Sequence, residues 1–301
     1  MSEGETITQP VEPRRLRTLF SADFMLLALL GAIILLAFGL EAWLPTRPTP
    51  FWLFWAGLAM SLIPALAWLT FFYRRDRRSP EPKALVLEVF ILGGLLAAAV
   101  SLPLLEDVFQ VDTWLSRSWP WSYLLGSFLV IGFTQEFLKY AAVRFSVYHS
   151  PAFDELTDGV IYATAAGLGF ATVLNIHFVN VSGGADLGLT SVWIVVNSLG
   201  HASFAGVAGY FLGRERFENR PIGWMPAGIA LAALLNALFF SLRTALTRGG
   251  FTSQGSPTNA WIGVVLAGLL AGAVTVGLAR LIRRDAGVVL GEPPTTIGEA
   301  G

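Results

Sequence analysis

The chain has 301 residues, of which 54% are hydrophobic and only 14% are charged, whereas about 25% of residues are charged in an average soluble domain. Twenty basic and 21 acidic residues nearly balance, which argues against nucleic acid as a partner because there is no basic excess to neutralise phosphates. There is no cysteine, so disulfides, thiolate metal sites and cysteine nucleophiles are excluded. The composition indicates an integral membrane protein that resides in a lipid bilayer.

A helix that crosses the hydrocarbon core needs about 20 mainly apolar residues. Eight stretches meet this requirement, and we predict a membrane-spanning helix in each: 24–44, 51–73, 84–105, 121–145, 158–181, 187–213, 222–242 and 258–282. The predicted fold class is therefore all-α, a polytopic membrane helix bundle with about eight transmembrane helices. Residues 23–284 form the predicted membrane domain, between polar, disordered tails at 1–22 and 285–301.

The basic residues predict the orientation of these helices, because cytoplasmic loops carry an excess of Lys and Arg. Fifteen of the 20 Lys and Arg residues lie on one side of the predicted bundle, four lie on the other side, and Lys139 lies inside a helix. The richer side holds both chain ends, so we expect a cell-membrane protein whose N- and C-termini are cytoplasmic. The stretch 106–120, with Trp114 and Trp119, is expected to lie along the outer interface.

The fourth predicted span contains the polar residues Gln135, Glu136 and Lys139. An ionisable side chain at this depth costs about 2.5–3.5 kcal/mol by insertion scales, so it indicates a functional role by default. Glu136 and Lys139 are three residues apart and share one helix face. Either they form a local ion pair that permits insertion, or Glu136 is a general base or ligand that Lys139 orients.

The sixth predicted span carries His201 near its middle, at about the depth of Glu136, and Asn197 lies one turn earlier on the same face. A lone histidine there could simply form a hydrogen bond between helices, but the matched depth favours a shared site. Simpler interpretations apply elsewhere. Asp158 suits a cap at the N-terminus of the fifth span, where the helix dipole stabilises a carboxylate, and Asn236 suits a hydrogen bond between helices.

From about residue 134 to residue 240 the sequence resembles the PrsW family of intramembrane metalloproteases, which belongs to the wider group that includes the CAAX-processing proteases. Four blocks occur in the family's order. They are Gln135-Glu136-Phe-Leu-Lys139 at its paired-glutamate motif, Asp158-Gly159 with the Gly-Leu-Gly-Phe-Ala helix at 167–171, His201-Ala202 followed by Gly209-Tyr210, and the helix that carries Asn236.

The resemblance implies an intramembrane peptidase with a protease-like core at about 121–242. Such an enzyme would cleave a membrane-embedded or juxtamembrane peptide bond of a membrane-protein or peptide substrate. The residues that it assigns to catalysis are Glu136, His201, Gln135 and Lys139. It also implies zinc, with His201, Glu136 and Asn236 as the metal ligands.

Three positions depart from the family pattern. Gln135 replaces the first glutamate of the pair, Leu174 replaces a glutamate expected before Asn175, and Asn236 replaces a second histidine. Amide oxygens bind zinc poorly, and an amide cannot act as a base. The alternative is therefore a catalytically inactive family member that binds membrane proteins as a scaffold or sensor. A transporter is less supported, because no internal repeat relates the two halves.

Overall fold

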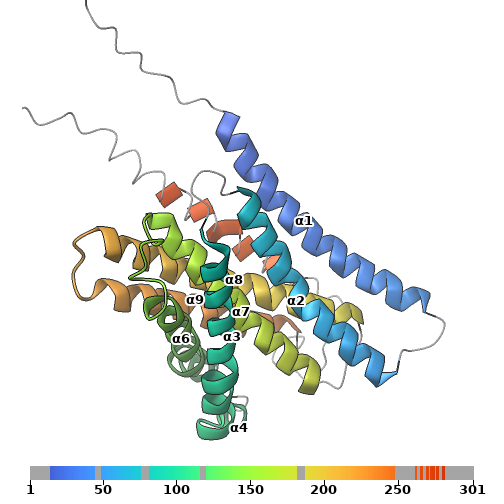
Figure 1. Ribbon diagram of the computed structural model, residues 1–301. Coiled ribbons are helices and arrows are strands. Elements are labelled where there is room, and N and C mark those ends of the chain that lie inside the picture. Colours follow the sequence, from blue (N-terminus) through green and yellow to red (C-terminus); the bar gives the residue numbers. More distant parts are fainter. Residues whose placement is uncertain are drawn as a thin grey trace, which may run out of the picture.

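The computed structural model describes residues 14–44, 49–75, 81–115, 120–181 and 187–247, with scattered positions between 262 and 281. Every regular element in these ranges is helical, as predicted. Figure 1 shows the arrangement of the helices, and π-helical stretches are labelled η. In chain order the elements are α1 (Arg14–Trp43), α2 (Pro50–Arg75), α3 (Lys83–Leu96), η1 (Ala97–Ser101), η2 (Leu104–Val108), α4 (Val111–Trp114), α5 (Pro120–Gly126), η4 (Ser127–Gly132), α6 (Phe133–Arg144), α7 (Leu156–Val181), α8 (Leu187–Phe217) and α9 (Trp224–Thr247).

Five helices among the described residues are long and apolar enough to cross a membrane: Pro50–Thr70, Lys83–Trp114, Leu156–Val181, Leu187–Phe217 and Trp224–Ser241. They match the second, third, fifth, sixth and seventh predicted spans. At the first span the described apolar stretch is shorter, Ala28–Trp43. The fourth, 121–145, is a continuous helical run of α5, η4 and α6, and most of 258–282 lies outside the described residues. The chain is a multi-pass membrane protein, and the count of eight spans stays a prediction.

The N-terminal boundary of the helical part differs from the sequence-based expectation. α1 begins at Arg14, so residues 14–22 are helical although they belong to a predicted disordered tail. After Pro13 this stretch contains neither Pro nor Gly, and nothing in it interrupts a helix that continues into the apolar segment. Residues 1–13 and 285–301 lie outside the described residues.

α8 is the innermost helix of the bundle. In an apolar 18-residue stretch of α8, 94% of the residues are buried, compared with 22% in the corresponding stretch of α2. α8 packs along α7 and also contacts α9, α1 and α2. Figure 1 shows α1 and α2 along one edge, outside the central helices α7 and α8. Most residues of α8 are therefore shielded from lipid by the neighbouring helices.

Small residues let α7 and α8 approach each other closely. Gly159 faces Gly209, and a Cβ on either glycine would overlap the backbone of the other helix. A Cβ on Gly167 would lie 2.6 Å from the carbonyl oxygen of His201. This close approach fixes the backbone of α8 at His201 against α7.

The outside and the inside of the bundle differ in polarity. Large apolar side chains are exposed along the outer helices, as contact with lipid requires, and they include Leu35, Leu36, Trp52, Leu66, Leu87, Leu95 and Leu129. Polar side chains are instead buried between α6, α7, α8 and α9, and they include Gln135, Glu136, Lys139, Asn175, Asn197, Ser198, His201 and Asn236. Burial of polar groups requires hydrogen-bond partners, and the arrangement of these partners defines the candidate site.

Candidate functional site

α6 carries the two charged residues of the site, Glu136 and Lys139. Their side chains are 0% and 1% exposed, and Lys139 Nζ lies 2.6 Å from Glu136 Oε1. The three-residue spacing places both side chains on one face of the helix. A single buried charge without a partner would be strongly destabilising, so this ion pair makes the burial of both charges possible.

Lys139 also reaches across to α8. Its Nζ lies 2.8 Å from Nδ1 of His201, which is itself buried. The Nζ atom lies 5.2 Å from the centre of the Phe170 ring on α7, and a cation is attracted to the face of such a ring. The ammonium group is therefore surrounded by a carboxylate, an imidazole and an aromatic ring from three helices.

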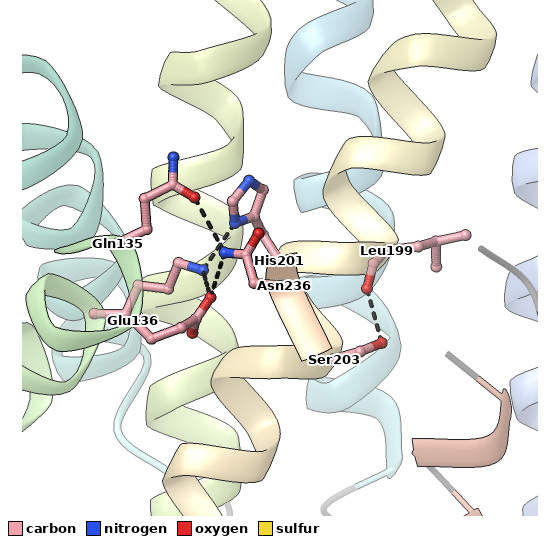
Figure 2. Close-up of polar contacts among 7 residues, drawn as sticks. Gln135, Glu136, Leu199, His201, Ser203 and Asn236 are labelled. Atoms are coloured by element: carbon pink, nitrogen blue, oxygen red, sulfur yellow. Dashed lines mark hydrogen bonds and ion pairs between the residues drawn. The ribbon is translucent and has the colours of Figure 1, made fainter. Parts of the chain in front are cut away.

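Asn236 on α9 completes the cluster. Its Nδ2 donates hydrogen bonds to Glu136 Oε1 at 2.8 Å and to Gln135 Oε1 at 3.1 Å. Figure 2 shows Gln135, Glu136, His201 and Asn236 pointing toward one another. The structure thus brings together all five residues that the sequence analysis assigned to catalysis or metal binding. We call Gln135, Glu136, Lys139, His201 and Asn236 the polar centre.

A second hydrogen-bonded group lies beside the polar centre, between α7 and α8. Asn197 Nδ2 donates to Asn175 Oδ1 at 2.9 Å, and Asn175 Nδ2 donates to Ser198 Oγ at 3.1 Å. All three side chains are buried. These contacts hold α7 and α8 in register one turn away from His201.

A cavity of about 310 Å³ lies against the polar centre. Four buried polar residues contribute to its wall: Gln135, Asn197, His201 and Asn236. The remaining wall is mainly apolar and aromatic, and it includes Leu102, Leu105, Ile131, Leu174, Phe178, Trp193, Phe204, Phe239 and Phe240. Glu136 and Lys139 do not line the cavity. They lie behind its wall, hydrogen-bonded to Asn236 and His201, which do line it.

The mouth of the cavity lies at the end of the bundle where α7 ends and α8 begins. Exposed Glu106 and Asp112 belong to its wall, and His177 Nε2 lies 2.8 Å from Glu106 Oε1. The predicted orientation puts this end on the side of the membrane opposite to the termini. Glu106 and Asp112 were not predicted from the sequence as site residues. The available signal was the acidic stretch 106–112 directly after an apolar span.

Another polar group lies at the other end of α7. Oxygen atoms of Glu81, Asp154 and Asp158 lie within 4.8 Å of one another, and the Tyr162 hydroxyl bonds to Glu81. Asp158 Oδ2 accepts hydrogen bonds from the backbone N–H groups of Asp154 (2.8 Å) and of the next residue (2.6 Å). Asp158 therefore caps the turn before α7, as predicted. About 24 Å of helix separates it from Leu174 in the cavity wall.

The donor atoms of the polar centre do not fit the zinc that the family resemblance implies. A catalytic zinc ion has three protein ligands, usually His, Glu, Asp or Cys, and one open position. The centre offers one carboxylate, Glu136, and one imidazole, His201, with amides at the two remaining positions. Oε2 of Glu136 has no hydrogen-bond partner within the described part of the chain, but Oε1 and His201 Nδ1 are both held by Lys139. These atoms do not make a three-ligand site.

The fold and the polar centre define a class: a multi-pass helical membrane protein with a buried polar site at the inner end of a mainly apolar cavity. Residues 81–270, which contain this site, match the model of a family described as PrsW family intramembrane metalloprotease. The chain belongs to this family. The resemblance found on the sequence motifs is therefore confirmed over a longer stretch.

Curated relatives support the same assignment. Protease PrsW of Bacillus subtilis is 29% identical over 192 residues, which cover 63% of this chain and 84% of the relative. Protease PrsW of Geobacillus kaustophilus is 30% identical over 197 residues, covering 64% and 82%, and that of Clostridioides difficile is 26% identical over 187 residues, covering 60% and 76%. No solved structure gives a significant match. The chain is thus a member of a membrane protease family, whose environment is the bilayer and whose substrates are peptides.

Proposed function

We propose that this chain takes a membrane-embedded or juxtamembrane segment of a substrate protein into the cavity and cleaves a peptide bond at the polar centre. The observation that carries the proposal is a mainly apolar cavity that ends at Gln135, His201 and Asn236. Apolar and aromatic walls suit the side chains of a transmembrane segment, whereas a few convergent polar groups suit its peptide group.

Gln135 and His201 are the groups that would bind the carbonyl oxygen of the substrate. Oε1 of Gln135 accepts a hydrogen bond from Asn236, so the amide N–H₂ group is the part of Gln135 left for a ligand. An ammonium has donors only, so His201 Nδ1 accepts from Lys139 and the proton of the neutral imidazole lies on Nε2. Both groups are then donors, which suits a carbonyl oxygen and the oxyanion that develops on it.

Glu136 is the group that would accept a proton from the attacking water. The water oxygen bonds to the carbonyl carbon, its proton passes to the carboxylate, and the same proton then moves to the amine nitrogen as the C–N bond breaks. Glu136 Oε1 lies 2.8 Å from Nδ2 of Asn236, which lines the cavity. Water therefore reaches the carboxylate when the Asn236 amide moves aside. Lys139 positions both Glu136 and His201.

The experiment that tests cleavage does not need a known substrate. Membrane fractions of cells that express the wild type or Glu136→Gln are compared by mass spectrometry of protein N-termini. We expect new N-termini within or beside transmembrane segments for the wild type and their loss for Glu136→Gln and His201→Ala. Glu88→Gln is the matched control, because Glu88 is an exposed carboxylate on α3 and undergoes the same chemical change. Equal sets of N-termini in the wild type and Glu136→Gln would contradict the site assignment.

One observation favours a second candidate function, binding without cleavage. Glu136 is fully buried, and its Oε1 is held by both Lys139 and Asn236. In this alternative the cavity binds a segment of a membrane protein, and the chain acts as a scaffold or sensor. A photo-crosslinking amino acid at Trp193, in the cavity wall, would then capture an intact partner, and no new N-termini would arise from that partner.

A further inference from the structure

We infer that the polar centre acts without a bound metal ion, and that the Lys139 ammonium takes the place of a cation between Glu136 and His201. The inference rests on the proposed function only in assigning the site to this cavity, and it holds for cleavage and for binding alike. The family is described as metalloproteases, so this chain would be a member whose site has changed its chemistry.

The Lys139 ammonium already lies where a metal ion would have to bind. Lys139 Nζ lies 2.6 Å from Glu136 Oε1 and 2.8 Å from His201 Nδ1. These two side chains are the only strong zinc ligands of the centre, since its other members are two amides and a lysine. Lys139 therefore already connects the two groups that a metal ion would have to connect. A metal at His201 Nδ1 would have to displace the ammonium.

The charge balance of the polar centre also disfavours a metal ion. The polar centre contains one carboxylate and one ammonium, so its formal charge is already balanced by Glu136 and Lys139. A divalent cation would add two positive charges within a buried cluster beside the ammonium, and like charges at such short distances repel strongly in a medium of low dielectric constant. A second carboxylate would offset this repulsion, but the neighbouring position is occupied by Gln135.

The orientation of the two amides disfavours a metal ion as well. Asn236 directs its Nδ2 group at both Glu136 Oε1 and Gln135 Oε1. An amide nitrogen has no lone pair to offer a metal ion, because that pair is delocalised into the carbonyl group. The oxygen of Gln135 is also used as an acceptor. The two amides thus complete a hydrogen-bonded network in which the Asn236 N–H₂ group donates to the oxygens of Gln135 and Glu136. This network stands where a set of metal ligands would be.

The inference is tested by the metal content of the purified full chain. The detergent-solubilised protein is incubated with zinc, dialysed and analysed by elemental mass spectrometry, and its thermal midpoint is measured with zinc and with EDTA. We expect the wild type to hold far less than one zinc ion per chain at the polar centre, and its thermal midpoint to be unchanged by EDTA. Gln135→Glu combined with Asn236→His supplies the missing ligands, so this variant should gain about one zinc ion and a zinc-dependent rise of its midpoint.

Two single variants assign any zinc that the wild type retains. Zinc that is lost in Asp154→Asn but kept in His201→Ala belongs to the acidic cluster of Glu81, Asp154 and Asp158, and it leaves the inference intact. About one zinc ion per chain that is lost in His201→Ala and kept in Asp154→Asn would overturn the inference.

Activity separates this inference from the proposed function. Cleavage that persists in EDTA supports both, and cleavage that requires zinc bound through His201 supports the proposed function and overturns the inference. Absence of both cleavage and zinc supports the inference and contradicts the proposed cleavage.

Discussion

Lys139 on α6 lies 2.8 Å from His201 on α8, although 62 residues separate them in the chain. The same nitrogen lies 2.6 Å from Glu136 Oε1. One ammonium group therefore neutralises a buried carboxylate, fixes the orientation of an imidazole and joins two helices. The stability of the bundle and the geometry of its site depend on the same atom.

Removing this ammonium is expected to destabilise the protein. Lys139→Met keeps most of the side-chain volume but leaves Glu136 charged and without its cation. Removing one partner of a buried ion pair typically lowers the free energy of unfolding by about 3–5 kcal/mol. Denaturation of the detergent-solubilised protein, followed by tryptophan fluorescence, measures this loss.

The double variant serves as the control for this prediction. Lys139→Met combined with Glu136→Gln removes both charges and should recover most of the free energy lost in Lys139→Met, because no buried charge then lacks a partner. The prediction is contradicted if the free energy of unfolding of Lys139→Met lies within about 0.5 kcal/mol of the wild-type value, because substitutions at ordinary surface positions have effects of that size. The ammonium would then not compensate a buried charge.

The contact between α7 and α8 gives a prediction about packing. A Cβ at Gly209 would overlap the backbone of Gly159, so Gly209→Val should separate the helices that carry Phe170 and His201. Overpacking of this kind costs about 1–3 kcal/mol. Gly31→Val on α1 makes the same change where no atom lies within 4 Å of the new Cβ. We expect a lower thermal midpoint for Gly209→Val and little change for Gly31→Val. Equal midpoints of the two variants would contradict the close packing of α7 against α8.

Gln135 gives a prediction about the chemistry. If its amide N–H₂ group binds the developing oxyanion, Gln135→Ala should slow cleavage by about 10²–10³-fold, the loss typical for one oxyanion donor. Expression and thermal midpoint should change much less than the rate. The control is Thr164→Val, a buried polar residue of α7 that does not line the cavity. Thr164→Val should cleave a membrane peptide at nearly the wild-type rate. If Gln135→Ala also cleaves at nearly the wild-type rate, Gln135 is not an oxyanion donor.

The residues of the polar centre could be selected from the sequence because the membrane makes polar residues conspicuous. Gln135, Glu136 and Lys139 interrupt an apolar stretch, and His201 and Asn236 interrupt two others. What the sequence could not predict is which atoms meet, because the rotation of each helix about its axis depends on packing across the whole bundle. The bond from Lys139 to His201 and the two bonds from Asn236 are results of that packing.

The fold was predictable to a similar extent. Apolar length predicted the five long spans well, since helices in a bilayer must satisfy their backbone hydrogen bonds internally. The predicted 121–145 segment is also helical throughout, as α5, η4 and α6, but it is not among the five helices that are long and apolar enough to cross a membrane. The residues of the cavity mouth, Glu106 and Asp112, carried no periodic signal, because exposed carboxylates beside a span are common.

The orientation of the bundle gives a final prediction, and the chain is suited to the test because it contains no cysteine. The distribution of basic residues predicts that the cavity mouth faces away from the cytoplasm. A membrane-impermeant maleimide should therefore label Asp112→Cys in intact cells, and it should label Asn219→Cys, an exposed position between α8 and α9, only after permeabilisation. The opposite pattern would place the mouth on the cytoplasmic side and both termini outside. The result decides which side of the membrane supplies water and the substrate segment, because Glu106 and Asp112 line the end of the cavity that reaches the surface.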